Sequence, residues 1–153
     1  IQRIETYEYP KEAIREALLN AIIHKDYSGN TPIQISVYKD KIMFWNDGQL
    51  PENWTVEKLS QKHASKPYNP DIANAVFRCG YIESWGRGTI KIIEECEKHG
   101  LPEPQFINDI EGMRVILYKN RTNPEFLNKL ELHQFLFIFA LAKTDGTAVF
   151  LVK

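Results

Sequence analysis

The first third of the chain changes from helical spacing of its apolar residues to alternation. In residues 12–24, apolar side chains recur every three or four positions, which predicts one amphipathic helix. Pro10 suits the first turn of this helix, and turn-forming residues from Tyr27 onward end it near Lys25. The stripe that we expect to face the core consists of Ile14, Leu18, Ala21 and Ile22.

Alternating segments predict two hairpins. Residues 33–38 alternate apolar and polar side chains, and residues 42–45 return as the second strand after a tight turn. A second hairpin is expected from residues 105–110 and 113–119. Residues 1–9 mix apolar and charged positions and are expected to add a short edge strand.

Further helices surround an irregular middle segment. Residues 55–59 predict a short helix, whereas residues 60–68 show little periodicity and are expected to be irregular and mobile. Asn69 is a favourable N-cap for a helix over residues 70–79. Another helix is expected over residues 90–99, and a glycine follows each of these two helices as a stop signal.

The composition is that of an ordinary soluble domain. With 153 residues, 43% hydrophobic and 25% charged, the chain fits one domain over residues 1–122 and a tail over residues 123–153. The net charge of -1 predicts no broad attraction to nucleic acid or to a membrane. Two cysteines without metal-ligand spacing fit a reducing cytoplasm, where we expect this chain. The apolar run 135–142 is too short to cross a bilayer, so it packs on this domain or on a second copy.

Three polar residues line a second face of the first helix. Glu16, Asn20 and His24 are spaced four apart, which places them one above another. One interpretation is the solvated edge of a surface helix. The other is a site, in which the carboxylate orients or deprotonates water and the amide oxygen ligates a hard cation.

Two loops carry residues that suit ligand binding as well as plain turns. The first hairpin ends at residues 46–48 (Asn-Asp-Gly), which also fit an ordinary strand exit. Residues 86–89 (Gly-Arg-Gly-Thr) lead directly into a helix. Glycines there let the backbone approach a ligand, and the free N–H groups of the first turn attract an anion. Each loop alone is weak support for a site.

These segments follow a specific order: acid-to-Asn helix, strand exit, irregular stretch and glycine-rich helix start. Five longer phrases accompany them: Tyr9-Pro10, Arg15-Glu16-Ala17-Leu18-Leu19-Asn20-Ala21, His24-Lys25-Asp26-Tyr27-Ser28, Asn69-Pro70 and Gly80-Tyr81-Ile82-Glu83-Ser84-Trp85-Gly86-Arg87-Gly88. The order resembles the ATP site of the GHKL ATPases, which include gyrase, the heat-shock chaperone, histidine kinases and the mismatch-repair protein. Over residues 7–118, the phrases resemble the ATPase-like domain of bacterial transcriptional regulators. Those regulators add a Schlafen-type AlbA domain and a winged helix, and they are often labelled helicase-related.

The resemblance implies a fold and a role for each matching residue. The fold is an α+β two-layer sandwich, with a mixed, mostly antiparallel sheet and the three main helices on one face. Glu16 would be the general base for the attacking water, and Asn20 would ligate the Mg²⁺ that bridges the ATP phosphates. Residues 51–80 would include a lid. The residues implied in cofactor binding are Asn20, Asn46, Asp47, Gly48, Gly86, Arg87, Gly88 and Thr89.

The strand exit departs from the pattern of these relatives. Asn46 falls where they place an Asp that reads adenine, and it can hydrogen-bond adenine without being a carboxylate. Gln49 or Leu50 stands where a second glycine is usual, and Asp47 is an alternative base reader if the register differs by one residue. These departures weaken the adenine pocket more than the phosphate pocket. No role follows for His24, which either faces the phosphates or completes the edge of the core.

Two functions follow as hypotheses. The first is a regulatory domain of a larger bacterial transcriptional regulator, which binds Mg-ATP and hydrolyses it slowly or not at all. The second is a non-catalytic interaction or dimerisation module that keeps the fold without the nucleotide, so a homodimer is an open alternative. The chain opens on Ile1, as an excised piece or a processed chain would. Any DNA contact is expected from other domains of the parent protein, because the cations here are interspersed with acids.

Overall fold

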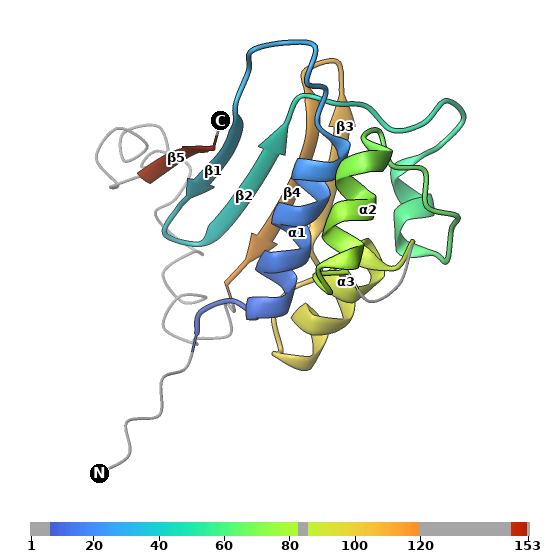
Figure 1. The fold of residues 1–153 in the computed structure, drawn as a ribbon. Coiled ribbons are helices and arrows are strands. Elements are labelled where there is room, and N and C mark those ends of the chain that lie inside the picture. The colour runs from blue at the N-terminus through green and yellow to red at the C-terminus, as the bar shows by residue number, and fades with distance from the viewer. Residues whose placement is uncertain (1–6, 83–85, 120–147, 153) are drawn as a thin grey trace.

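The fold is an antiparallel sheet with helices packed against it, shown in Figure 1. The computed structural model describes residues 7–82, 86–119 and 148–152. In chain order, the described elements are α1 (Lys11–His24), β1 (Ile33–Val37), β2 (Lys41–Asn46), the 3-10 helix η1 (Val56–Ser60), α2 (Pro70–Arg78), α3 (Gly88–Lys98), β3 (Gln105–Asp109), β4 (Gly112–Tyr118) and β5 (Ala148–Val152).

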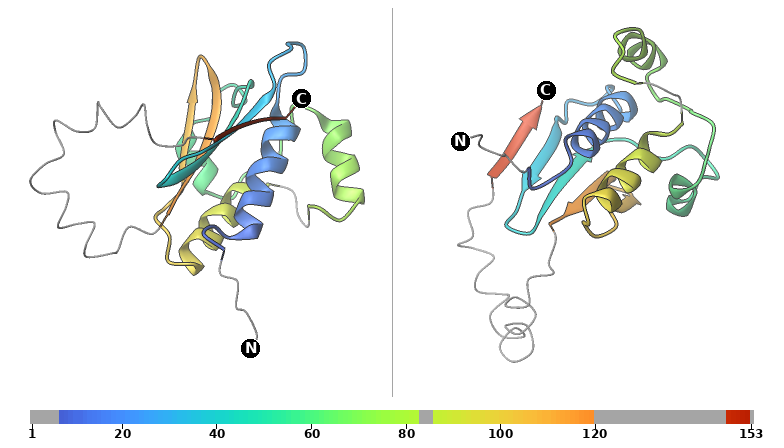
Figure 2. Two further views of the ribbon diagram at one scale, coloured as in Figure 1. Left: turned by 90° about the vertical axis from the view of Figure 1, so that its left-hand side faces the viewer. Right: turned by 90° about the horizontal axis from the view of Figure 1, so that it is seen from below.

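The five described strands form one sheet in the order β3-β4-β2-β1-β5. Both expected hairpins are present, because β1 pairs with β2 and β3 pairs with β4. Every described pair is antiparallel, so this part of the sheet is antiparallel throughout and not mixed. The helices α1, α2 and α3 lie on one face of the sheet (Figure 2). The predicted α+β two-layer sandwich is therefore confirmed.

Helix α1 is buried on two sides, against the sheet and against α3. The side chains of Ala13 and Ala17 are fully buried, because small residues let the helix approach its neighbours closely. Ile92 of α3 is fully buried in the same cluster. The larger aliphatic residues of α1 that were expected to face the core lie at the border of the core instead. The reason is that α3 packs against the side of α1 that carries Ala13 and Ala17. The half-buried aliphatic residues are Ile14, Leu18 and Ile22.

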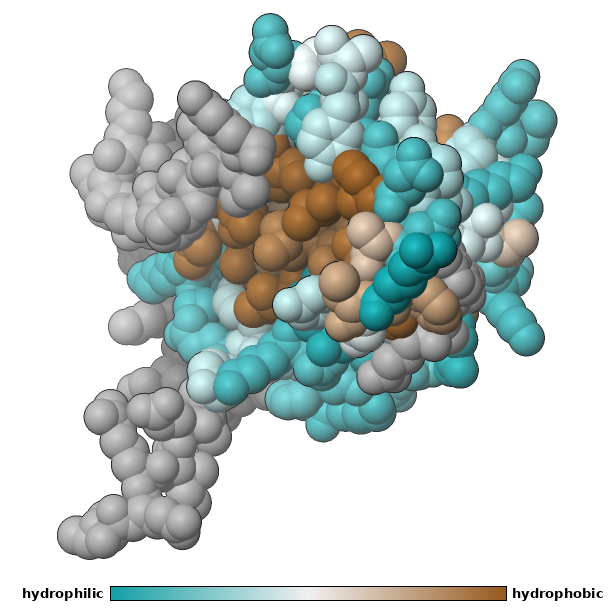
Figure 3. Space-filling view, viewed as in Figure 1, coloured by the Kyte–Doolittle hydropathy of each residue, from teal (hydrophilic) through white to brown (hydrophobic). Residues whose placement is uncertain are grey.

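The helices cover the middle of the sheet more closely than they cover β1. Ile35 and Val37 of β1 are only partly buried, although their cross-strand partners on β2, Phe44 and Ile42, are buried in the core. Figure 3 shows the consequence, a patch of apolar side chains over α1, β1 and β2. On the other face, Ser36 is buried, where alternation predicted an open polar position.

The C-terminus of α1 is closed by side chains from the next turn and from the start of α2. Tyr27 donates its hydroxyl hydrogen to the carbonyl of Ile22 (3.0 Å). The side-chain amide of Asn69 donates to the carbonyls of Ile23 (2.8 Å) and Lys25 (2.7 Å). Asn69 does occupy the N-cap position of α2, but its side chain makes no cap bond there. The predicted side-chain cap is wrong because this amide satisfies carbonyls that α1 leaves open.

Replacing Asn69 with Ala should lower the free energy of unfolding by about 1–2 kcal/mol, because the Lys25 carbonyl loses its side-chain donor and the Ile23 carbonyl keeps only the backbone N–H of residue 69. Urea unfolding followed by circular dichroism measures this loss. Asn74→Ala, on the exposed side of α2, is the matched control and should change stability by less than about 0.5 kcal/mol. A loss no larger than that of the control would show that other contacts hold the junction.

Part of what the sequence predicted falls outside the described residues. The edge strand expected over residues 1–9 lies mostly there, and residues 7–9 bend into α1 without forming a strand. The apolar run 135–142 also lies outside. The pairing of β5 with β1 places residues 148–152 in the sheet, while the domain boundary at residue 122 stays a prediction. The described helices are all too short or too polar to span a membrane.

Candidate functional site

A cavity of about 100 Å³ lies where α1, the ends of β2 and β4, the start of α3 and residues 51–68 meet. We call residues 51–68 the lid segment. It contains η1, close to the predicted short helix, and is irregular elsewhere. Six of the residues predicted for a site line this cavity, so the fold brings together segments far apart in the sequence. They are Asn20, Asn46, Gly48, Gly86, Gly88 and Thr89.

Asn20 lies at one end of the cavity, against the start of α3. Its amide nitrogen is buried and has no hydrogen-bond partner among the described residues. A Cβ added at Gly88 would lie 2.9 Å from that nitrogen and 3.2 Å from the Glu16 carboxylate, so glycine is what allows α3 to begin here. A buried amide left unpaired costs about 1–3 kcal/mol. The arrangement therefore points to a polar ligand beside Asn20.

Asn46, Gly48 and His24 form the other end of the cavity. Asn46 ends β2 and is 4% exposed. A Cβ added at Gly48 would collide with the His24 carbonyl and lie 2.9 Å from the Asn46 amide nitrogen. His24 therefore lies beside the strand exit, one helical turn beyond Asn20. Burial lowers the pKa of His24 below its usual 6.5, and the neighbouring His63 lowers it further, so the ring is mainly neutral at pH 7.

The lid segment is fastened to the start of α3. In the lid, the rings of Trp54 and His63 meet edge to face, with 4.9 Å between their centroids. Gly86 has a φ of 74°, and a Cβ there would collide with the His63 carbonyl, so the lid backbone uses the space that glycine leaves. The hydroxyl of Thr89 donates to the carbonyl of Leu59 in η1 (2.7 Å). Both contacts connect residues predicted for the site to its cover.

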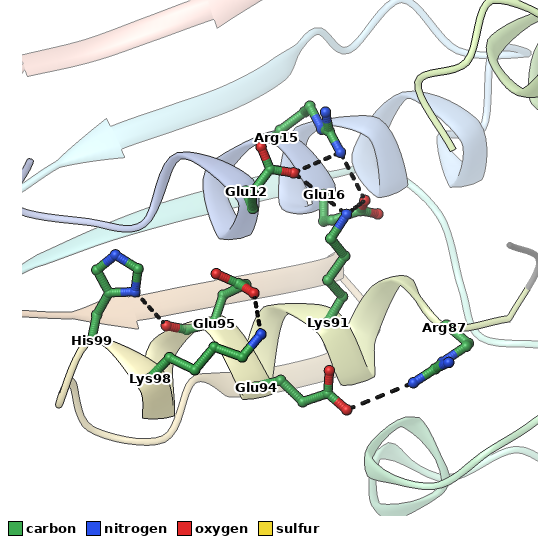
Figure 4. Close-up of polar contacts among 9 residues, drawn as sticks. All are labelled: Glu12, Arg15, Glu16, Arg87, Lys91, Glu94, Glu95, Lys98 and His99. Atoms are coloured by element: carbon green, nitrogen blue, oxygen red, sulfur yellow. Dashed lines mark hydrogen bonds and ion pairs between the residues drawn. The ribbon is translucent and has the colours of Figure 1, made fainter. Parts of the chain in front are cut away.

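Glu16 lines a second cavity of about 190 Å³, which shares Gly88 with the first. The Glu16 side chain is almost fully buried. Nζ of Lys91 on α3 lies 3.4 Å from its carboxylate, and Nη2 of Arg15 lies 3.8 Å away (Figure 4). Both cations also approach Glu12 on α1. These four charges form a cluster that joins α1 to α3 beside the glycine-rich helix start.

Burial raises the pKa of Glu16 above its usual 4.5, while Lys91 and Arg15 lower it in part. A carboxylate with a raised pKa is a stronger base, which suits proton abstraction from water. Because the folded protein holds this proton more tightly than the unfolded chain, the contribution of Glu16 to stability is fully present below pH 4.5. It is lost as the pH rises through the folded-state pKa, and Lys91 limits that loss.

Replacing Lys91 with Met should raise the pKa of Glu16 further and destabilise the protein mainly at high pH. At pH 8 the Glu16 carboxylate is charged, and only the more distant Arg15 remains as a cation beside it among the pairs described here. We therefore expect the free energy of unfolding to fall by about 1–3 kcal/mol. Below pH 4.5 the carboxyl is protonated, so the loss should be small. Urea unfolding at both pH values and an NMR titration of Glu16 measure the two effects. Lys39→Met, in the exposed turn after β1, is the control, and equal losses at both pH values would assign Lys91 to packing instead of charge.

Two of the predicted site residues lie away from the first cavity, besides Glu16. Arg87 lines the second cavity with its side chain 59% exposed. Among the described residues, Asp47 lines neither cavity, and its carboxylate lies 3.6 Å from the position of a Cβ added at Gly29. Asn46 is therefore better placed than Asp47 to contact a ligand in the first cavity.

Sequence reasoning missed Lys91 and the lid residues Trp54, His63 and Lys66. Lys91 carried a weak signal, because it stands three residues after Gly88 and returns to the same side of the helix. The three lid residues also line the first cavity, and Lys66 brings a positive charge to its wall. Their segment has no periodicity, so no pattern in the sequence could have placed them there.

Comparison with known proteins assigns the family. Residues 30–117, more than half of the chain, match the model of an ATPase-like family described as "Putative ATP-dependent DNA helicase recG C-terminal". The chain belongs to this family. The predicted ATPase-like domain is therefore confirmed. The matched range of this ATPase-like domain includes the strand exit and the glycine-rich start of α3, whereas α1, with Glu16 and Asn20, precedes it.

A solved structure of the DIP2311 protein from Corynebacterium diphtheriae has a similar fold. The TM-score is 0.65 at 24% sequence identity, over 74% of this chain. At that identity the likeness shows the fold alone, and the match covers 23% of the DIP2311 chain. Among curated proteins, none matches this chain in sequence. The roles of single residues stay predictions that the comparisons do not reach.

The part of the chain that the structure describes offers few ligands for a metal ion by itself. Within residues 7–82, 86–119 and 148–152, no three His, Cys, Asp or Glu side chains come together as a metal site. Mg²⁺ is usually bound by one or two protein oxygens together with substrate phosphates and water. Asn20 fits this ion through its side-chain oxygen, because no described partner of the amide nitrogen fixes the orientation of the amide, and the Glu16 carboxylate lies near Gly88 beside it.

Proposed function

We propose that this domain binds Mg-ATP in the first cavity. The observation that carries the proposal is the Asn20 amide, which is buried at the start of α3 and has a nitrogen without a partner among the described residues. At the opposite end, Asn46 meets a wall that includes the apolar side chains of Leu50 and Met113, which suits a purine ring. Membership of an ATPase-like family agrees with a nucleotide as the ligand.

In this arrangement the phosphates extend from the base toward Gly88. The N–H groups in the first turn of α3 favour an anion there. Lys66 of the lid adds positive charge at the cavity wall. The side-chain oxygen of Asn20, brought round by a half-turn of the amide, would hold Mg²⁺ against the phosphates, and the bound ion would neutralise charge that develops on them.

Hydrolysis is proposed to be slow. Glu16 is the carboxylate nearest to the Asn20 end, but it lines the neighbouring cavity and is paired with Lys91 and Arg15. A base held by two cations is less free to take a proton from water than an unpaired one. Binding and release of the nucleotide would then matter more than turnover, which fits a switch that controls other domains.

Mg-ATP should make the lid segment more protected from hydrogen exchange. The cavity of about 100 Å³ is small beside the roughly 300–1,000 Å³ of typical small-molecule sites, so residues 51–68 must move to admit a nucleotide and close over its phosphates. Amide exchange in this segment should slow at least about tenfold at saturating Mg-ATP. Amides of α2 serve as an internal reference. Equal protection of the lid with and without nucleotide would argue against closure.

Titration with a fluorescent ATP analogue, with and without Mg²⁺, tests the function directly. We expect saturable binding that weakens at least about tenfold when EDTA removes Mg²⁺. Ala21 lines the cavity and is buried, so Ala21→Leu should fill the space and abolish binding. Ala75→Leu on the exposed side of α2 is the matched control, and thermal melts establish that both variants fold.

Absence of binding by the folded parent chain would overturn the proposal and favour the second hypothesis, a non-catalytic interaction or dimerisation module. Two observations speak for that alternative. The strand exit carries Asn46 where relatives have a carboxylate, and the space left by Gly86 is taken by the lid backbone. Sedimentation analysis of the chain would then test whether it forms a homodimer.

A regulatory role in a larger bacterial protein completes the proposal. The match covers only 23% of the DIP2311 chain, which is consistent with a module among others. With a net charge of -1, this chain lacks the excess of cations that duplex DNA requires. We propose that the domain belongs to a cytoplasmic transcriptional regulator whose other domains contact DNA.

A further inference from the structure

We propose that Asn46 lets this site accept purine nucleotides with either a 6-amino or a 6-oxo group, so that ATP and ITP bind with similar affinity. The inference rests on the proposed nucleotide site and adds to it the chemistry by which the base is selected. Its physical basis is an amide with a fixed position and two usable orientations.

The backbone that carries Asn46 is held firmly. Asn46 is the last residue of β2 and is paired with β4. The residues that follow it are tied to the end of β3, where Gln49 donates to the Asp109 carbonyl (2.6 Å) and the Leu50 N–H donates to the Asn108 side chain (3.1 Å). The strand exit therefore cannot shift easily, and the side chain of Asn46 stays at the cavity wall.

The amide group itself is held weakly. Its nitrogen donates to the Asp47 carbonyl at 3.4 Å, which is longer than the usual range of roughly 2.7–3.2 Å. Gly48 leaves space beside the amide, since a Cβ there would lie 2.9 Å from the Asn46 nitrogen. A half-turn of the amide exchanges its oxygen and nitrogen without moving the backbone. Asn46 can thus present a donor or an acceptor to the cavity.

Adenine and hypoxanthine differ in the hydrogen-bonding groups at position 6 and at N1, and an amide can pair with either set. The 6-amino group and N1 of adenine offer a donor and an acceptor, and an Asn amide pairs with such an edge through its oxygen and nitrogen. The 6-oxo group and N1–H of hypoxanthine offer the reverse order, which the rotated amide matches after it gives up the long bond to the Asp47 carbonyl. An ionised carboxylate only accepts, so it would favour the 6-amino group and repel a 6-oxo oxygen.

The other polar side chains at this end of the cavity do not restore a preference for adenine over hypoxanthine. Gln49 uses its amide nitrogen on the Asp109 carbonyl. The carboxylate of Asp47 is away from the cavity, near Gly29. His24 is the remaining neighbour, and its ring carries one donor and one acceptor when neutral, so it also matches both bases. The side chains that contact the base edge can therefore both donate and accept hydrogen bonds.

Competition of ATP and ITP against a fluorescent nucleotide, in the presence of Mg²⁺, tests this inference on the unmodified chain. We expect dissociation constants within about threefold of each other. Tripolyphosphate serves as a probe without a base and should bind much more weakly than either. A parent chain that prefers ATP over ITP by tenfold or more would overturn the inference while leaving the nucleotide site intact. Failure of both nucleotides to bind would overturn the proposed function and this inference with it.

The variant Asn46→Asp should create selectivity. At pH 8 we expect the affinity for ITP to fall at least about tenfold relative to the affinity for ATP, because the carboxylate cannot donate to the 6-oxo group. Asn74→Asp adds the same charge on the exposed side of α2 and should leave the ratio unchanged. Asn46→Ser, which keeps a donor and an acceptor, replaces the Asp variant if that protein fails to fold, and should keep the ratio near one. An unchanged ratio in folded Asn46→Asp would show that Asn46 does not read the base.

Discussion

Glu16→Gln should slow ATP hydrolysis by roughly 10²–10⁴-fold while changing ATP affinity little. The amide keeps the size of the side chain but cannot accept a proton from the attacking water. Glu16 suits this role because it is buried and its pKa is raised by that burial. Glu16 and Asn20 both lie near Gly88 at the start of α3. This position brings Glu16 close to the proposed phosphates and keeps it away from the base.

Phosphate release per molecule of protein measures this effect, and the nucleotide titration measures affinity in the same sample. Glu97→Gln, on the exposed side of α3, removes an equal charge and should leave the rate unchanged. A rate of the Glu16→Gln variant equal to that of the parent would remove Glu16 from the chemistry. A parent chain that binds Mg-ATP without any turnover would contradict the catalytic role and leave a binding switch.

Asn20→Ala should abolish most Mg²⁺-dependent nucleotide binding. A buried ligand to a charged centre contributes on the order of 2–3 kcal/mol, which corresponds to roughly 30- to 150-fold in Kd. In the absence of nucleotide, the Asn20→Ala variant should lose little stability. The amide nitrogen has no partner among the described residues, so its removal breaks no described hydrogen bond of that nitrogen. The variant thus separates a binding role from a structural one.

Titration of Asn20→Ala with the ATP analogue, in Mg²⁺ and in EDTA, gives the result. The difference between the two conditions should disappear, whereas Asn74→Ala should keep it. Thermal melts should show neither variant to be less stable than the parent. If Asn20→Ala binds Mg-ATP as tightly as the parent, the assignment of Asn20 as the metal ligand is wrong.

Local patterns in the sequence predicted most of the described elements of the fold. Alternation identified β1 and β2, helical spacing identified α1, and end signals such as the N-cap and the glycine stop identified α2, because these patterns depend on local geometry. The order of short polar segments also anticipated which residues meet. Asn20, Asn46 and Gly88 come from separate elements and line one cavity. Each of them lies at the end of an element or on a distinct helix face, and the roles that the resemblance implies for them stay predictions.

Only the tertiary structure decided which contacts these residues make. The side chain of Asn69 bonds to the end of α1 and not to its own helix, since the distance between two elements determines which carbonyl is near. Glu16 faces Lys91 in a second cavity because α3 packs beside the alanine face of α1. Local patterns were enough for most of the described elements and for the ATPase-like family. Packing between elements determined the burial, pairing and charge of each group, because these depend on neighbours far apart in the chain.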